Sequence, residues 1–226
     1  MALHHLKHIL LATPFVLITI APFIAIANWL TISLDPKLVA LGALGWWIAL
    51  LLRAPVMLLA RRLPQQKASR LVVLASGSAE EIIRLILLLI LGLTTQNAYS
   101  VGLGWAAIEI LYSLVQGFGM AVLAQKRDAK ALEAKKLLKA MGMERAMQPS
   151  AVYWGIVERL GANALHISFA LLLVVSPYLV LATATLHSLA NFGITKLMKR
   201  SLAAAELLFL GLGAGLFLAA LVLVPR

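Results

Sequence analysis

Cysteine is absent from the 226 residues of the sequence, so the chain can form no disulfide bond and offers no thiolate as a metal ligand or nucleophile. Charged residues make up only 13% of the chain, and acidic residues are the rarer kind, with 9 against 20 basic ones. The period-two alternation typical of a transmembrane β-barrel is not seen. Repeated units and low-complexity tracts are missing too. Because the connections between the apolar stretches are short, we predict that residues 1–226 form a single domain.

Apolar residues, in contrast, dominate the sequence. They account for 62% of the chain, and the mean hydropathy is +0.94, whereas a soluble domain is roughly 45–50% apolar. A helix crosses a bilayer core of about 30 Å with about 20 apolar residues. We therefore predict an all-α, polytopic membrane helix bundle with about seven transmembrane helices. The predicted spans are residues 9–32, 38–60, 70–93, 99–124, 152–175, 178–196 and 202–224.

The net charge of +11 is distributed in an alternating pattern along the chain. Basic residues gather before the first predicted span and in the connections after the second, fourth and sixth, whereas the other connections carry almost none. By the positive-inside rule, this pattern places the N-terminus in the cytoplasm and the C-terminus outside. Membrane topology thus explains the basic character, and we expect the lipid bilayer, and no nucleic acid, as a partner. The basic residues concerned are Lys7, Arg61, Arg62, Lys67, Arg70, Lys126, Arg127, Lys130, Lys135, Lys136, Lys139, Arg145, Lys196, Lys199 and Arg200.

The N-terminal stretch also has features of a signal peptide. It has a basic start, an apolar run and the tripeptide Ala25-Ile26-Ala27, which could serve as a small-residue cleavage site. The run is long for a signal peptide, and keeping residues 1–27 makes the later connections obey the charge rule. We therefore interpret it as a retained span.

The only long connection covers residues 125–150. Ala129, Leu132, Leu138 and Met141 recur among its lysines at near-helical spacing. This pattern is typical of a basic amphipathic helix that lies on the anionic cytoplasmic leaflet. A solvated, charged hairpin between two helices fits the same residues, and the sequence leaves both interpretations open.

Ionisable side chains inside the predicted spans indicate a functional site. At bilayer depth each costs about 2.5–3.5 kcal/mol on insertion scales, so a chain keeps them where they pair, bind an ion or take part in chemistry. Glu80, Glu81 and Arg84 lie within about one helical turn of one another, and one arginine holds one carboxylate firmly. The second carboxylate is then free to act as a general base. An ion pair that only tethers helices is the simpler alternative.

Further polar residues lie at a similar depth on three other predicted spans. Like Glu80, the residues Glu109, His166 and His187 lie about 9–14 residues from the predicted span ends, which places all four in one central slab of the bilayer at about 1.5 Å per residue. Two neutral imidazoles and a carboxylate form a donor set suited to zinc. We therefore predict a divalent metal, with zinc the expected ion, held by His166, His187 and Glu109. A nearby glutamate would take the proton of the bound water.

Taken in order along the chain, the polar motifs resemble those of a known family. The motifs are Glu80-Glu81-x-x-Arg84, then Glu158-Arg159 followed by the mid-span His166, and finally His187-x-x-x-Asn191. This set resembles the YhfC-type intramembrane metalloproteases, which are relatives of the CAAX prenyl endopeptidases and of PrsW-type proteases. The resemblance covers roughly residues 70–196. CAAX endopeptidases usually space the first motif Glu-Glu-x-x-x-Arg, so the shorter spacing here favours the YhfC branch.

The resemblance implies a function and a location for the chain. It implies a metal-dependent endopeptidase of the bacterial cytoplasmic (inner) membrane, which cleaves a membrane-associated protein or peptide in or near the bilayer. The two motif histidines would bind the metal or the water.

The resemblance also implies roles for single residues. Either Glu80 or Glu81 would activate the water, with Glu80 preferred, and Arg84 would orient the other glutamate. Asn191 would help to stabilise an oxyanion. Glu158 belongs to the implied catalytic set as the acidic member of the second motif.

Two other function classes stay open on the sequence. The same superfamily includes a non-catalytic scaffold subunit, so a scaffold or binding role is one alternative. Intramembrane carboxylates and histidines also form proton relays, so a proton-coupled transporter is the other. No inverted repeat or pair of broken helices is visible in the sequence, which counts against transport. Bound metal would separate a protease from a scaffold, and substrate-coupled proton flux would indicate a transporter.

Three further features lead to expectations about packing. Arg53 has no partner in its own predicted helix, so it either neutralises a carboxylate of the cluster or extends toward the interface. Glu206, one turn into the last span, is expected to reach water or Lys199, and we leave it out of the site. Small residues allow close helix packing in lipid, and four glycines of the fourth span suit this role: Gly102, Gly104, Gly117 and Gly119.

The charge pattern can be tested with topology reporters. A reporter active only outside the cytoplasm should be active when fused to the C-terminus and inactive when inserted near Lys135. The measurement is reporter activity in whole cells, with fusion amounts matched by immunoblotting. The opposite pattern would contradict the seven-span interpretation or show that residues 1–27 are removed.

Overall fold

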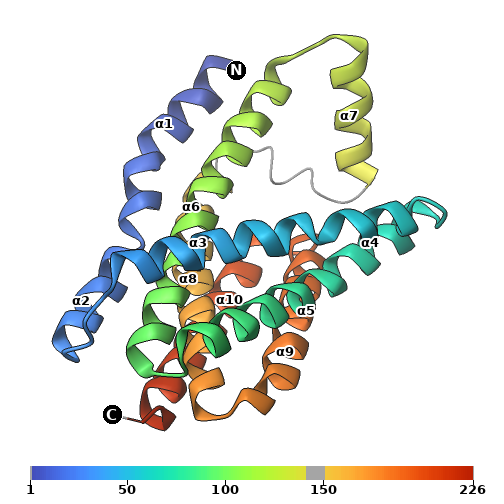
Figure 1. Cartoon of the computed structure of the whole chain (residues 1–226). Helices are drawn as coiled ribbons and strands as arrows, with labels where there is room; N and C mark the ends of the chain where they lie inside the picture. Colours follow the sequence, from blue (N-terminus) through green and yellow to red (C-terminus); the bar gives the residue numbers. More distant parts are fainter. Residues whose placement is uncertain (1, 141–150, 226) are drawn as a thin grey trace.

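The described part of the chain is almost entirely helical. The computed structural model describes residues 2–140 and 151–225, and these contain no β-strand (Figure 1). The predicted all-α class is therefore confirmed. The elements are α1 (Ala2–Ile18), α2 (Ala21–Trp29), α3 (Pro36–Leu51), α4 (Arg53–Ala60), α5 (Gln65–Leu91), α6 (Thr95–Gln125), α7 (Ala129–Ala140), α8 (Ala151–Val175), a 3-10 turn (Pro177–Leu179), α9 (Val180–Met198) and α10 (Leu202–Leu223).

Five stretches of the described chain are long and apolar enough to cross a bilayer, as expected of an integral membrane protein. They coincide with five of the predicted spans. The other two predicted spans fall on α5, which contains the charged Glu80, Glu81 and Arg84, and on α9, which contains His187, Asn191 and Lys196. The count of seven and the orientation of the N-terminus stay predictions. The five stretches are Leu10–Trp29, Pro36–Ala60, Thr95–Gln125, Tyr153–Val175 and Leu202–Leu223.

Proline interrupts two of these stretches. A proline ring within a helix clashes with the carbonyl four residues earlier and removes one hydrogen bond. For Pro22 that carbonyl belongs to Ile18, where α1 ends, and for Pro55 it belongs to Leu51, where α3 ends. The second break makes Arg53 the first residue of α4. Helix α4 continues in nearly the direction of α3, and α5, which carries the two adjacent glutamates, runs back alongside both (Figure 1).

Helix α8 is the buried centre of the molecule. In its apolar stretch 72% of the residues are buried, against 28% or less in the other four stretches. It packs against α6 and α10 on its two sides and also contacts α1. Large apolar side chains on the outer helices, such as Ile90, Leu181 and Val222, are in contrast mostly exposed. Such a surface suits a lipid environment, whereas polar side chains of α8 are enclosed within the bundle.

Glycines on α6 divide this helix into a packed half and an open half. A Cβ atom on Gly104 would overlap the carbonyl oxygen of Val39 on α3, and one on Gly102 would lie 2.7 Å from the Cα of Ile167 on α8. The expected close packing is therefore confirmed for these two. It is wrong for Gly117 and Gly119, because a Cβ there would meet nothing within 4 Å. These two border a cavity instead.

Helix α7 accounts for the first half of the long connection. It stands apart from the main bundle in Figure 1. The Lys135 ammonium donates hydrogen bonds to the carbonyl oxygens of Ala124 (2.9 Å) and Lys126 (2.7 Å), which ties α7 to the end of α6. A helix is thus present at the predicted place. Residues 141–150, including Met141, lie outside the described residues.

The two halves of α6 predict opposite effects of the same substitution. Gly104→Ala should lower the Tm of the detergent-solubilised protein, because the added methyl group overlaps the backbone of α3. Gly119→Ala should leave the Tm unchanged or raise it, since alanine is favoured over glycine in a helix by about 1 kcal/mol and the space is free. Thermal unfolding measured side by side checks this. Equal effects would contradict the packing described here.

Candidate functional site

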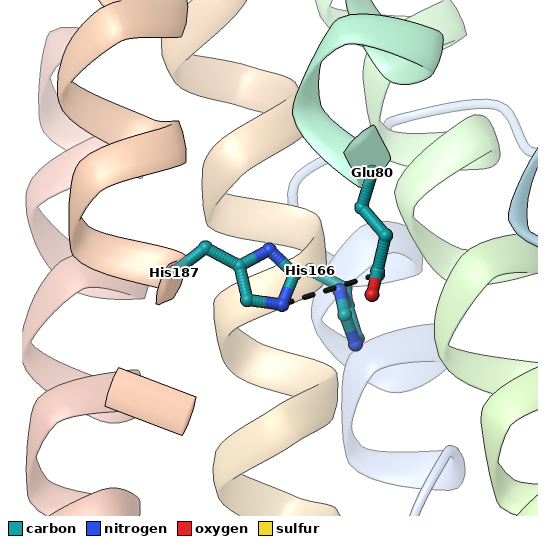
Figure 2. Close-up of side chains that lie close together, drawn as sticks. All are labelled: Glu80, His166 and His187. Carbon is teal, nitrogen blue, oxygen red and sulfur yellow. Dashed lines mark ion pairs between the residues drawn. The ribbon is translucent and has the colours of Figure 1, made fainter. Parts of the chain in front are cut away.

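Many of the polar residues within the bundle line one cavity of about 810 Å³. Glu80, Glu109, His166 and His187 all line it, as expected from their predicted depth. They come from α5, α6, α8 and α9, respectively. Figure 2 shows the side chains of Glu80, His166 and His187 converging from three of these helices. The cavity also extends along the open half of α6, so the cluster has access to a larger space.

Glu80 is held by two donors and faces the cavity. One carboxylate oxygen pairs with the Arg53 guanidinium, and the other accepts a hydrogen bond of 2.9 Å from the indole nitrogen of Trp105. Of the two alternatives for Arg53, neutralisation of a carboxylate is therefore observed. The Trp105 contact was not predicted. The sequence alone does not show whether a tryptophan within a predicted span donates a hydrogen bond or only packs.

Glu81 lies behind Glu80 and does not line the cavity. Its carboxylate pairs with Arg84, three residues along the same helix, and both side chains are fully buried. The Arg84 guanidinium also lies 4.5 Å from the ring centroid of Trp105. Since Arg84 holds Glu81 and Arg53 holds Glu80, each glutamate of the pair has its own arginine.

His187 connects the two glutamates. Its Nδ1 lies 2.8 Å from the carboxylate oxygen of Glu81, and because that carboxylate is an acceptor, Nδ1 carries the proton. In the neutral imidazole the other nitrogen, Nε2, then has its lone pair free. This Nε2 is 3.9 Å from the Glu80 oxygen that accepts from Trp105, as the dashed line in Figure 2 marks. That distance is too long for a hydrogen bond and leaves room for a small ligand.

His166 has both ring nitrogens engaged. Its Nδ1 lies 3.1 Å from the guanidinium of Arg84, and its Nε2 contacts the carboxylate of Glu109. A guanidinium can only donate, so Nδ1 accepts and Nε2 donates to Glu109. The two imidazole rings lie 5.5 Å apart between centroids. Each histidine is thus oriented by a carboxylate on another helix.

Glu158 is not brought to Glu80, although both were predicted as catalytic residues. Arg159 connects it instead to Glu109: the guanidinium lies 3.0 Å from Glu109 and 2.6 Å from Glu158. Glu158 lines the same cavity. It precedes His166 by eight residues on α8, which is about 12 Å along the helix axis.

Asn191 lines the cavity one turn beyond His187. Its amide nitrogen lies 3.3 Å from the Ser76 hydroxyl, to which it donates. Asn191 therefore lines the same cavity as the two histidines, but its side chain is hydrogen-bonded to α5. Asn163, in contrast, donates to the backbone of Thr19 on the α1 side, and it plays no part in the cluster.

A close contact between α5 and α9 sets the position of His187. The Ser188 hydroxyl donates to the carbonyl oxygen of Leu74 over 2.7 Å. A Cβ on Gly77 would lie only 2.6 Å from the backbone nitrogen of Ser188, so only glycine allows this approach. The glycine is one turn before Glu81, which places that carboxylate beside the His187 ring. Neither Gly77 nor Ser188 was predicted to matter.

Glu206 also lines the cavity, which corrects the expectation that it reaches water or Lys199. It is 2% exposed, and Lys199 is exposed on the surface. Among the ion pairs of the described residues, none joins Glu206 to Lys199.

Comparisons with protein families, with curated proteins and with solved structures gave no match. The roles of the site residues are therefore inferred from their geometry alone, and the resemblance to YhfC-type proteases stays a prediction.

One group of described residues has the donor types of a zinc site. Ligand atoms of Glu80, His166 and His187 lie within 4.8 Å of one another, and this group contains Glu80 where Glu109 was predicted. Glu81 on the Nδ1 of His187 is the outer contact that metal-binding histidines usually have. Two ligands of a tetrahedral zinc lie about 3.4 Å apart, so the 3.9 Å between Glu80 and His187 requires a small closure. His166 would exchange one of its present partners. The residues fit zinc with these adjustments.

Proposed function

We propose that the chain is an intramembrane, metal-dependent endopeptidase that hydrolyses a peptide bond in or near the bilayer. The observation that carries this proposal is the pair formed by Glu80 and His187, which is buried, faces a cavity and leaves 3.9 Å between carboxylate and imidazole. Both side chains are held by further partners before any ligand arrives. Preorganised acid–base groups of this kind are what hydrolysis requires.

Glu80 is suited to act as the general base. Peptide hydrolysis needs a group that takes a proton from water as the oxygen attacks the carbonyl carbon, and that returns it to the leaving nitrogen. The Glu80 carboxylate faces the cavity, and the gap to His187 admits a water oxygen about 2.8 Å from each. Glu81 is committed to Arg84 and His187 and is not in the cavity wall. We therefore assign Glu81 and Arg84 a positioning role.

Asn191 is the donor we assign to the oxyanion. The charge that develops on the carbonyl oxygen is stabilised by a fixed hydrogen-bond donor in a water-poor site. Asn191 lines the cavity next to His187 on the same face of α9. Its amide nitrogen would exchange Ser76, at 3.3 Å, for the substrate oxygen.

The metal proposal concerns His166, His187 and one carboxylate. When bound, zinc supplies a Lewis acid and makes its water a stronger nucleophile near neutral pH. His187 would bind through Nε2, because Glu81 occupies its other nitrogen. The converging group of described donors contains Glu80, but Glu80 cannot serve as ligand and free base at once, so we keep Glu109 as the proposed carboxylate ligand. Glu109 now accepts a hydrogen bond from His166 Nε2 and would have to give it up to bind the metal.

Substitution of the two adjacent glutamates tests the base. Glu80→Gln keeps the size of the side chain but cannot accept the proton, so cleavage should fall about 10²–10⁴-fold while the metal is retained. Glu81→Gln should mainly lower the Tm, because breaking a buried ion pair costs about 3–5 kcal/mol. The measurements are cleavage of fluorescence-quenched transmembrane peptides in proteoliposomes, thermal unfolding and metal content.

The exposed Glu133→Gln on α7 is the matched control and should change nothing. Loss of activity in a stably folded Glu81→Gln protein alone would reverse the assignment within the pair. Loss of metal with Glu80→Gln would make Glu80 a ligand. If neither substitution changes a working cleavage reaction, the mechanism proposed here is wrong.

Metal analysis tests the histidines. Purified protein should contain about one equivalent of metal, which His166→Ala or His187→Ala should abolish while the protein still inserts in the membrane. Metal affinity should also fall at acid pH, because protons compete for the imidazole nitrogens. Elemental analysis of detergent-purified protein checks both. A double variant that keeps a full equivalent would remove these residues from the metal site.

A further inference from the structure

A second pair of carboxylates lines the cavity away from the two histidines. Glu158 on α8 and Glu206 on α10 both contribute to its wall. Glu206 is only 2% exposed, whereas the Glu158 side chain is 38% exposed. Glu206 lies close enough to Glu158 and Arg159 for their charges to act on it. Neither carboxylate contacts Glu80, so the site assigned above does not use them.

Close packing of α8 and α10 brings the pair together. A Cβ on Gly213 would overlap the backbone of Gly161, and one on Gly161 would lie 3.0 Å from the Cα of Leu210. The helices run in the same direction, because Val174 near the end of α8 and Leu221 near the end of α10 line the same second pocket. Residues one turn earlier therefore also face one another, and these include Glu158 and Glu206.

Glu206 has an unpartnered, buried oxygen. Its Oε2 is buried and has no hydrogen-bond partner among the described residues. A buried carboxylate without a partner is costly, by several kcal/mol if it is charged. Three other carboxylates of the described residues each pair with an arginine: Glu80 with Arg53, Glu81 with Arg84, and Glu109 with Arg159. Glu81 also has one oxygen without a hydrogen-bond partner, but it does not line the cavity. Glu206 does line it, and its unpartnered oxygen therefore indicates a position for a ligand donor.

The charges of the cavity wall predict the sign of that ligand. Within the described residues, the wall has four carboxylates but only two arginines. Arg53 is used by Glu80, and Arg159 is shared between Glu109 and Glu158. Glu158 therefore shares its arginine with Glu109, and the ion pairs of the described residues include none for Glu206. A cation bound beside Glu206 would supply the missing counter-charge and favour the ionised carboxylate.

The neighbouring residues favour an organic cation over a metal ion. Leu123, Met198, Leu202 and Phe209 line the cavity together with Glu206. Hard cations such as Ca²⁺ need six to eight oxygen ligands, which apolar side chains do not supply. A long aliphatic stem that ends in a charged group matches such walls, and lysine and arginine side chains have this form.

We propose that Glu206 and Glu158 form a subsite for the lysine or arginine side chain of a peptide substrate. The proposal rests on the endopeptidase function for its biological meaning, although binding can be measured without cleavage. The ammonium or guanidinium group would donate to the free oxygen of Glu206 and to Glu158, and its stem would lie along the apolar wall. About 12 Å of α8 separates Glu158 from His166, so the subsite would select a residue a few positions from the cleaved bond.

Binding of matched peptides tests the subsite. The probes are a short fluorescent peptide of alanine and leucine with one lysine, and the same peptide with that lysine acetylated. They are titrated onto the full chain in nanodiscs, with Glu80→Gln present so that no cleavage intervenes. The lysine peptide should bind about tenfold more tightly, the size expected of a hydrogen bond between charged groups in a buried site. Glu206→Gln should abolish this preference, and Glu158→Gln should reduce it.

Matched variants control for folding and for surface charge. Glu206→Asp keeps the carboxylate and should keep part of the preference, and Glu133→Gln on exposed α7 should keep all of it. Thermal unfolding confirms that each variant is folded. Equal binding of both peptides to the protein with an intact Glu206, or an unchanged preference in Glu206→Gln, would overturn the proposal.

Two further measurements are needed. One distinguishes a peptide from a lipid as the source of the cation, and the other tests the subsite separately from the endopeptidase function. The preference should be equal in phosphatidylglycerol and phosphatidylethanolamine nanodiscs; its loss in the latter would assign the subsite to a lipid ammonium headgroup and overturn the peptide assignment. Cleavage is measured separately with Glu80 intact. A lysine preference without cleavage would support the subsite and count against the endopeptidase. Cleavage without a lysine preference would support the endopeptidase and overturn the subsite.

Discussion

The arrangement of the site depends on one buried guanidinium, that of Arg84. It is fully buried, pairs with Glu81 on its own helix, contacts His166 on α8 and lies over Trp105 on α6. An unpaired charge in such a place costs several kcal/mol, whereas a paired and hydrogen-bonded charge recovers most of that cost. Three helices must therefore hold its partners in place. The contacts that stabilise this buried charge are thus also the contacts that orient the two histidines.

The other charged and polar side chains of the site are also paired across helices. Each imidazole donates to a carboxylate from another helix, His187 to Glu81 and His166 to Glu109. Such contacts fix which nitrogen carries the proton and how the ring is turned. Because Arg159 holds Glu109 in turn, the orientation of His166 depends on the α6–α8 contact. Protein contacts alone therefore orient both rings.

Local features of the site could be predicted from the sequence, and contacts between helices could not. The pairing of Glu81 with Arg84 follows from three-residue spacing on one helix, and the common depth of Glu80 and the histidines follows from helical rise. The Arg53 and Trp105 contacts to Glu80 depend on how each helix is rotated about its own axis. Backbone contacts set those rotations, and spacing alone does not show which glycines make them. The all-α class was readable from composition, whereas the polar site residues themselves interrupt two of the predicted spans.

The open half of α6 has a consequence for recognition. Gly117 and Gly119 present bare main chain to the cavity, and inside a helix that main chain has its hydrogen-bonding groups already satisfied. At these two positions the α6 wall offers no side chain, although Glu109 and Gln116 of the same helix do line the cavity. On α8 and α10 the wall carries Glu158, Arg159 and Glu206. If a peptide binds as proposed above, it would meet main chain at Gly117 and Gly119 and charged side chains on α8 and α10.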